Sequence, residues 1–380
     1  MTTVIKPGGA GTSGAVEPDP VVVPDPPPGG GRSSRFGALD LARIGRATLR
    51  WAVIGAATLA IFSAFLAAKG ASPVEVLRAM RDTAFGDADG VGETLIRAVP
   101  FFLAGLATAV PARAGLFNIG AEGQLLLGAI GAVGMARVVP DGLPGPLALL
   151  LLCVGGAVLG GLWAAIPAVL RIVCRMNEAI ASLLLNYVAG LIVTWLCFEP
   201  WKDPQSLGQA YTVELASNER LPIMWGARVH AGIAIALVVG IGCWLLVRST
   251  TWGFKLGVLG GNPEAARRAG LAVGGLSVAA LVLGGSLAGL GGAIEVAGVE
   301  GRLRPEILAG YGYVGFLVAW LGRHHPLKVM GAAVLLGAIA VGGSGLRIAS
   351  GLSGGAVNIL MAVVLFAVLG WGRPTTEATR

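Results

Sequence analysis

Polar side chains that could bind a solute stand inside an otherwise apolar stretch at residues 113–127, which reads Arg-Ala-Gly-Leu-Phe-Asn-Ile-Gly-Ala-Glu-Gly-Gln-Leu-Leu-Leu. Asn118, Glu122 and Gln124 supply hydrogen-bond donors and acceptors there. In a helix, Asn118 and Glu122 would share one face because they are four residues apart. A carboxylate in an apolar environment is costly and faces protein or water. Two interpretations stay open: contact with a solute, or a hydrogen-bonded patch between helices.

A second polar stripe follows at the start of the apolar stretch 178–198. Glu178, Ser182 and Asn186 recur every four residues, which places them on one helical face, and Tyr187 stands beside them. Donors and acceptors next to an aromatic ring suit a polar solute with a flat ring. A ladder of hydrogen bonds within the core is the alternative.

Two positions in the last third of the sequence could also face a pathway. Glu295 ends the segment Leu-Ala-Gly-Leu-Gly-Gly-Ala-Ile-Glu, and it either snorkels to water or lines the path. Residues 310–315 form a literal GxGxxG, but no βαβ unit surrounds them, so we reject a dinucleotide site. Their glycines instead permit close packing, and Tyr311 or Tyr313 could face the pathway.

Residues 261–270 carry the signals of a short, self-contained helix. An asparagine stands at the N-cap, a proline at the first helical position, a glutamate in the first turn, two arginines in the last turn and a glycine as the stop. We interpret this helix as a docking element for a soluble partner, with an interfacial helix on anionic lipid as the alternative. The residues assigned to docking are Gly261, Asn262, Pro263, Glu264, Ala265, Arg267 and Arg268.

The composition places these motifs in a membrane. Of 380 residues, 55% are hydrophobic and 13% charged, whereas soluble domains carry about 25% charged residues. The 61 glycines fit membrane helices that pack through small residues. The net charge of +7 is spread through short loops, where it sets topology, so nucleic acid is not implied as a partner.

Several classes of chemistry are missing from the sequence. No GxxxxGK[ST] phosphate-binding loop is present, and no nucleophile triad or HExxH motif suggests an enzyme. ATP hydrolysis, if it drives this protein, must come from another chain. We assign the four cysteines as small buried hydrophobes rather than disulfides or metal ligands: Cys153, Cys174, Cys197 and Cys243.

We predict an all-α polytopic membrane protein with about ten spans and possibly two related halves. Residues 1–45 form a disordered Pro/Gly-rich tail, 46–372 the transmembrane domain and 373–380 a second tail. Alternation of the spans puts most loop arginines on one side, so both termini are predicted to be cytoplasmic. The spans are predicted near 51–68, 94–112, 116–136, 146–170, 178–198, 230–247, 275–298, 307–321, 329–348 and 355–371.

Five of these segments, in the same order, resemble permease subunits of bacterial ABC importers in the branched-chain amino acid, ribose and nucleoside superfamily. The likeness is greatest to the nucleoside and simple-sugar branch and covers roughly residues 90–371. The segments that carry it are 113–124, 177–187, 261–270, 287–295 and 310–322.

The resemblance implies a type II-like importer permease in the bacterial inner membrane. Its partners would be an ATPase that uses ATP and Mg, a second homologous permease chain in a heterodimer, and an extracytoplasmic solute-binding lipoprotein. It identifies 261–270 as the coupling helix that docks in the ATPase. This chain itself would bind no cofactor or metal. The expected solute is a nucleoside, with ribose-like sugars and branched-chain amino acids as alternatives. An ion-coupled secondary transporter is the rival function.

Overall fold

The computed structural model describes residues 41–140, 142–226, 228–350 and 355–371. The chain divides into two units, Met1–Arg50 and Trp51–Arg380. Helix α1 begins at Leu41, so residues 41–45 of the predicted tail are helical, and the rest of both predicted tails lies outside the described residues.

The longer helices are α1 (Leu41–Ala68), α2 (Pro73–Phe85), α3 (Ala88–Ala112), α4 (Ala121–Ala136), α5 (Gly145–Val173), α6 (Glu178–Phe198), α7 (Gly232–Ser249), α8 (Thr251–Gly261), α10 (Val273–Glu295), α11 (Tyr311–Leu321), α12 (Pro326–Ser350) and α13 (Gly355–Trp371). The shorter elements are η1 (Ser217–Glu219), β1 (Ile223–Trp225), β2 (Val229–His230), α9 (Pro263–Arg268) and the π-helical turn η2 (Val296–Glu300).

Every predicted span overlaps a helix, but the count of ten is not confirmed. Among the described residues, six helices are long and apolar enough to cross a membrane, and the bent pair α1–α2 makes a seventh if it counts as one span. Three other apolar helices, α4, α11 and α13, are shorter. The chain turns by 116° between α1 and α2, so the loop predicted after the first span holds a further helix.

Side-chain caps begin several helices where the sequence places an Asp, Asn or Thr. The Asp87 carboxylate accepts a hydrogen bond from the Gly90 amide at 2.7 Å at the start of α3. Asn177 accepts one from the Ala179 amide at 2.9 Å at the start of α6. These bonds satisfy amides that have no partner within the helix, which fixes where the helix begins.

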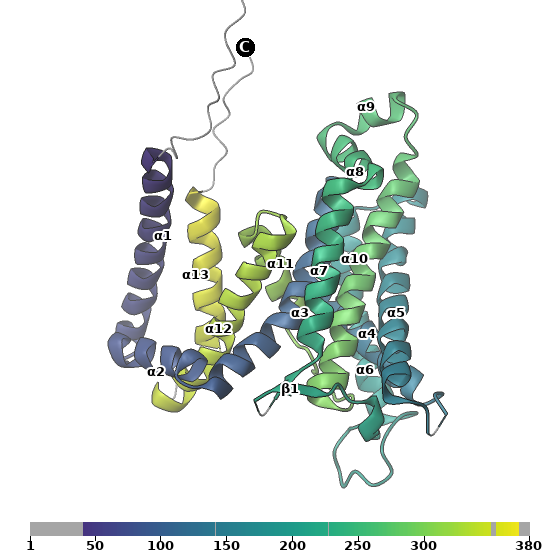
Figure 1. Cartoon of the computed structure of the whole chain (residues 1–380), viewed down its shortest axis with the longest axis horizontal. Coiled ribbons are helices and arrows are strands. Elements are labelled where there is room, and N and C mark those ends of the chain that lie inside the picture. Colours follow the sequence, from purple (N-terminus) through teal and green to yellow (C-terminus); the bar gives the residue numbers. More distant parts are fainter. Residues whose placement is uncertain (1–40, 141, 227, 351–354, 372–380) are drawn as a thin grey trace, which may run out of the picture. The chain divides into compact units, whose positions relative to one another are not determined.

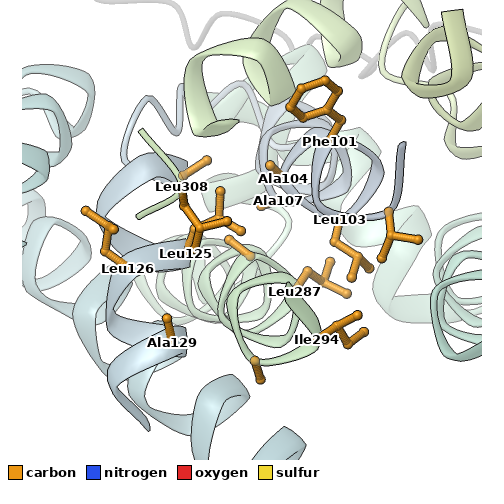
Figure 2. Packing of buried hydrophobic residues seen from close by; sticks show 14 of the residues in the cluster. Phe101, Leu103, Ala104, Ala107, Leu125, Leu126, Ala129, Leu287, Ile294 and Leu308 are labelled. Atoms are coloured by element: carbon orange, nitrogen blue, oxygen red, sulfur yellow. The ribbon is translucent and has the colours of Figure 1, made fainter. Parts of the chain in front are cut away.

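The core lies where α3, α4, α5 and α10 pack together. Figure 2 shows apolar side chains of α3, α4 and α10 gathered in one cluster, among them Leu103, Leu125 and Leu287. Glycines let α5 and α10 approach closely, since a Cβ atom at Gly160 would stand 2.6 Å from the Cα atom of Gly289. Close helix packing of this kind replaces the hydrophobic driving force that is absent within lipid.

The two long connections lie at opposite ends of the helices (Figure 1). One end carries α8 and α9, and the other carries the antiparallel hairpin β1–β2. The alternation of spans predicts this arrangement, whereas the helix α8 and the hairpin were not predicted. Which end faces the cytoplasm stays a prediction from the arginine distribution.

Candidate functional site

Two helices that are too short to cross a bilayer meet at Glu122. Helix α4 has 16 residues and α11 has 11, or roughly 24 and 16 Å at 1.5 Å per residue, against about 30 Å of hydrocarbon. Glu122 lies in the first turn of α4, and its carboxylate accepts hydrogen bonds from the Gly310 and Gly312 amides at 2.5 and 2.6 Å. It therefore caps the N-terminus of α11 from a different helix, where the helix dipole favours a negative charge.

Such paired N-termini are typical of transporter sites. Discontinuous helices in transporters place their N-terminal ends at the solute position. Here Glu122 is 7% exposed, so the junction lies inside the bundle. Gly312 permits the contact, since a Cβ atom there would overlap the backbone of Glu122.

The expectation that Asn118 and Glu122 share a helical face is wrong. Helix α4 begins at Ala121, and Asn118 lies in the preceding irregular segment, where Gly115 has a φ of +72°. Asn118 and Gln124 instead exchange two side-chain hydrogen bonds of 2.9 Å. Asn118 also donates to the Ala107 carbonyl at 3.0 Å, and both amides are fully buried. Their hydrogen bonds hold the irregular segment against α3, as the helix-patch interpretation predicts.

The second polar stripe has the predicted helix and the predicted shared face. Glu178, Ser182 and Asn186 are all buried on α6. Glu178 forms an ion pair with Arg171 on α5, and Ser182 donates to the Ala179 carbonyl at 3.1 Å. These two side chains are thus engaged in contacts within the bundle.

Asn186 connects the stripe to the junction of α4 and α11. Its carbonyl oxygen accepts from the Gly123 amide at 2.9 Å, and its Nδ2 atom donates to the Ile119 carbonyl at 3.0 Å. The same Nδ2 atom lies 3.5 Å from the Tyr313 hydroxyl. One amide therefore holds together α4, α6 and α11.

A pocket of about 550 Å³ opens at this junction. Four of the residues singled out from the sequence line it, namely Glu122, Asn186, Tyr187 and Tyr313. Tyr187 is 67% exposed, so its ring is available for contact. The remaining lining residues are Leu126, Gly190, Leu191, Val193, Thr194, Glu306, Ile307 and Ala309. The volume lies within the range of small-molecule sites.

Glu306 belongs to this pocket and was missed from the sequence. It is exposed, and its backbone has a φ of +61°, a left-handed conformation that non-glycine residues rarely adopt. Leu308 has a φ of +60°, so the segment that leads into α11 is irregular. The sequence did contain a signal for Glu306, because it is a lone carboxylate in Arg-Pro-Glu-Ile-Leu, just before the glycine-rich segment.

Two other predicted residues do not reach the pocket. Tyr311 points to a different chamber, where its ring packs edge-on against Phe101 with centroids 5.2 Å apart. Glu295 is 3% exposed at the end of α10, so its expected snorkelling to water is wrong. Asn118, Gln124 and Ser182 lie outside the pocket lining as well.

The sequence matches a known protein family over most of its length. A family model described as "Branched-chain amino acid transport system / permease component" matches residues 90–369. The chain belongs to this family. The permease is 37% identical over 325 residues to the glucose ABC transporter permease protein TsgB13 of Haloferax volcanii, covering 82% of this chain and 84% of that protein. It is 33% identical over 289 residues to the guanosine ABC transporter permease protein NupP of Bacillus subtilis, covering 75% and 82%. It is 28% identical over 295 residues to the nucleoside ABC transporter permease protein NupB of Lactococcus lactis, covering 75% and 80%.

The permease is therefore a multi-pass membrane protein and a permease subunit of an ABC transporter, and such subunits are not themselves enzymes. The resemblance seen in the sequence, to the nucleoside and simple-sugar branch, is confirmed by these relatives.

The permease also has the predicted capped helix, α9. The Asn262 side-chain oxygen accepts from the Glu264 and Ala265 amides, each at 3.0 Å. Glu264 forms ion pairs with Arg267 at 2.6 Å and with Arg268 at 3.3 Å. All seven residues assigned to docking are exposed, including Gly261 at the end of α8 and Pro263 at the start of α9. Helix α9 lies beyond the ends of α7 and α10 (Figure 1).

One residue anchors α9 to the bundle. Ala266 is fully buried against an apolar cluster that includes Leu116, Leu256 and Leu281. The neighbouring positions Ala265 and Ala269 are exposed. The helix is thus attached on one side and presents its charged residues on the other.

Proposed function

We propose that this permease imports an uncharged, hydroxyl-bearing solute, a nucleoside or a related simple sugar, by alternating access. The lining of the 550 Å³ pocket carries this proposal. It combines the carboxylates of Glu122 and Glu306 with two tyrosines and the Asn186 amide, and among its described lining residues there is no lysine or arginine. Carboxylates accept hydrogen bonds from hydroxyl groups, and tyrosine rings pack against flat rings.

The same lining argues against a branched-chain amino acid. An amino acid carries a carboxylate as well as an ammonium group, and the described lining of the pocket offers no lysine or arginine to pair with that carboxylate. A charge that enters a partly desolvated site without a partner is costly. A nucleoside or sugar carries no such charge and fits the pocket chemistry.

We assign the coupling role to α9, with Gly261, Asn262, Pro263, Glu264, Ala265, Arg267 and Arg268 as the docking surface. Its exposed charges and its single buried anchor, Ala266, support contact with a soluble partner more than contact with lipid. The proposed importer contains an ATPase that uses ATP and Mg, a second permease chain and a solute-binding lipoprotein. We place it in the bacterial inner membrane with both termini in the cytoplasm.

The rival, an ion-coupled transporter, needs a carboxylate that releases and binds a proton or cation. Both oxygens of Glu122 accept backbone hydrogen bonds, and Glu178 is paired with Arg171. Neither group is free for that role, and the relatives TsgB13 and NupP are permeases of ABC transporters, which together favour the ATP-driven importer.

Radiolabelled uptake in cells that express the whole importer tests the proposal. The solutes are uridine, adenosine, ribose, glucose and leucine. The double variant Glu264→Arg/Arg267→Glu keeps an ion pair within α9 but reverses its surface charges, and a catalytically inactive ATPase provides the second lesion. Uptake of a nucleoside or sugar that falls to background in both cases supports the proposal.

Two results would overturn it. Leucine uptake without nucleoside or sugar uptake would replace the solute class. Uptake that survives the inactive ATPase would replace the importer by an ion-coupled transporter. Membrane levels of each variant, measured by immunoblot, serve as the control.

A further inference from the structure

A second chamber lies on the other side of the segment that leads into α11. It has a volume of about 310 Å³ and is lined by residues of α3, α11, α12 and α13, together with Ala309 and Gly310. Ala309 lines the 550 Å³ pocket as well. Tyr311 faces the second chamber and Tyr313 the first, so the first turn of α11 separates two chambers that each contain a tyrosine.

Arg97 is the charged residue in the described lining of the second chamber. It lies within α3, and its guanidinium carbon is 5.2 Å from the centre of the Tyr311 ring. Its nearest carboxylate is that of Glu93, at 3.7 Å, which is too long for a hydrogen bond. Across the described part of the chain, no hydrogen bond from this guanidinium is found. The side chain is 30% exposed.

An arginine in a membrane-spanning helix is costly unless its donors are satisfied, and it marks solute pathways by default. The planar guanidinium carries five donors and no acceptor. Next to it, Asn358 and Ser344 add further polar atoms to the lining. The second chamber is therefore rich in donors, whereas the 550 Å³ pocket is rich in acceptors.

The second chamber has a neighbour towards the hairpin end of the molecule. Ser344 lines both this chamber and a third pocket of about 440 Å³ between the start of α3 and the hairpin β1–β2. Glu93, the ion-pair partner of Arg97, lines that third pocket too, where it lies 3.6 Å from Arg228. The third pocket, at the hairpin end of the molecule, and the second chamber, at the first turn of α11, thus lie next to each other at Ser344.

We propose that the chamber between Arg97, Tyr311 and Asn358 is a second solute-binding position, which holds the solute before it reaches the pocket at Glu122. Arg97 and Asn358 donate hydrogen bonds to acceptor atoms of the uncharged solute, such as a carbonyl, ring nitrogen or hydroxyl oxygen, and Tyr311 contacts its ring. This inference rests on the proposed function, because it takes the same nucleoside or sugar as its ligand.

Substituted-cysteine labelling tests the position directly. In membranes that contain the whole importer, a membrane-impermeant thiol reagent applied from the hairpin side would label Ser344→Cys. The unsubstituted protein gives the background labelling of the native cysteines. We expect the transported solute to slow the labelling several-fold. We expect Arg97→Met, added to Ser344→Cys, to abolish that protection.

Uptake kinetics provide the second measurement. Loss of a charge-assisted hydrogen bond would lower uptake at limiting solute about tenfold or more in Arg97→Met. Arg97→Lys keeps the charge but not the planar fork, so we expect an intermediate loss. Arg302→Met is the matched control. The guanidinium carbon of Arg302 also lies over a tyrosine ring, 4.4 Å from the centre of Tyr211, but Arg302 lines none of the three pockets.

Three outcomes would overturn the inference. The solute could leave the labelling of Ser344→Cys unchanged, Arg97→Met could transport normally, or Glu93→Gln could reproduce the loss, which would make the ion pair and not the guanidinium responsible. In each of these cases the unsubstituted permease still imports a nucleoside or sugar. Failure of the proposed function is distinguishable, because the unsubstituted importer would then take up neither.

Discussion

Glu122 and Arg97 are charged groups on opposite sides of the first turn of α11, and their surroundings differ. Glu122 accepts two short hydrogen bonds from backbone amides, whereas Arg97 has an ion pair of 3.7 Å and a tyrosine ring. A charge whose hydrogen bonds are closed within the protein contributes to the fold. A charge whose donors have no partner among the described residues contributes little to the fold and leaves those donors open to a ligand.

Glu122→Leu is expected to have the largest effect on stability. It leaves the Gly310 and Gly312 amides without an acceptor, at about 1–3 kcal/mol for each buried donor. We expect a clear drop in the thermal unfolding midpoint of the purified permease, followed by fluorescence-detected size exclusion. Glu122→Gln keeps one acceptor oxygen and should lose less. Equal stability of the leucine variant and the unsubstituted protein would contradict the capping role.

His230 predicts an acid-dependent loss of stability near the hairpin. Its Nδ1 atom accepts from the Gly232 amide at 3.1 Å, its Nε2 atom is buried with no hydrogen-bond partner among the described residues, and burial lowers its pKa to about 4. The unfolded chain takes up a proton near pH 6.5 and the folded protein near pH 4. Stability is therefore lost as the pH falls from about 6.5 towards 4.

The measurement is the unfolding midpoint of the permease at about pH 7.5 and about pH 5. His230→Asn should flatten this dependence, because asparagine does not titrate. A pH dependence that persists unchanged in the variant would assign the effect to other groups.

Asn262→Ala should have a smaller effect, confined to α9. The substitution removes the acceptor for the Glu264 and Ala265 amides and costs about 1 kcal/mol of helix stability. We expect faster amide hydrogen exchange in residues 263–268 and reduced uptake, with little change in the unfolding midpoint. Asn262→Asp keeps the cap and is the control. Unchanged exchange in the alanine variant would show that packing of Ala266 alone maintains the helix.

Arg97→Met should have the smallest effect on stability, or should raise it slightly. No hydrogen bond from the guanidinium is lost within the described protein, and the 3.7 Å pair with Glu93 is partly exposed, which makes it weak. Thermal unfolding beside Glu122→Leu gives the comparison directly. Strong destabilisation by Arg97→Met would mean that both charges serve the fold.

Local signals in the sequence predicted more than distant ones. The cap of α9 depends on residues next to one another, so Asn262 and Pro263 predict it fully. The stripe on α6 likewise follows from the spacing of Glu178, Ser182 and Asn186. The two polar stripes also pointed to Glu122, Asn186 and Tyr187, which do line one pocket.

Tertiary contacts explain what the sequence could not predict. The start of α4 was misplaced because the irregular segment before it is held by bonds from Asn118 to α3 and from Asn186 on α6. The left-handed backbone of Glu306 arises from the path into α11 and has no local signature. The sequence could not tell which chamber Tyr311 and Tyr313 each face, because their directions depend on the packing of α3 against α11.

The bond between Glu122 and Gly310 joins residues 188 positions apart. At synthesis rates of about 5–20 residues per second, a ribosome needs roughly 10–40 s to make the chain between them. During that interval the nascent protein holds a carboxylate in its half-built bundle with no amide to receive it. Synthesis of the start of α11 then supplies both amides, so a chain that stops short of residue 310 leaves the Glu122 carboxyl without either of these two hydrogen bonds.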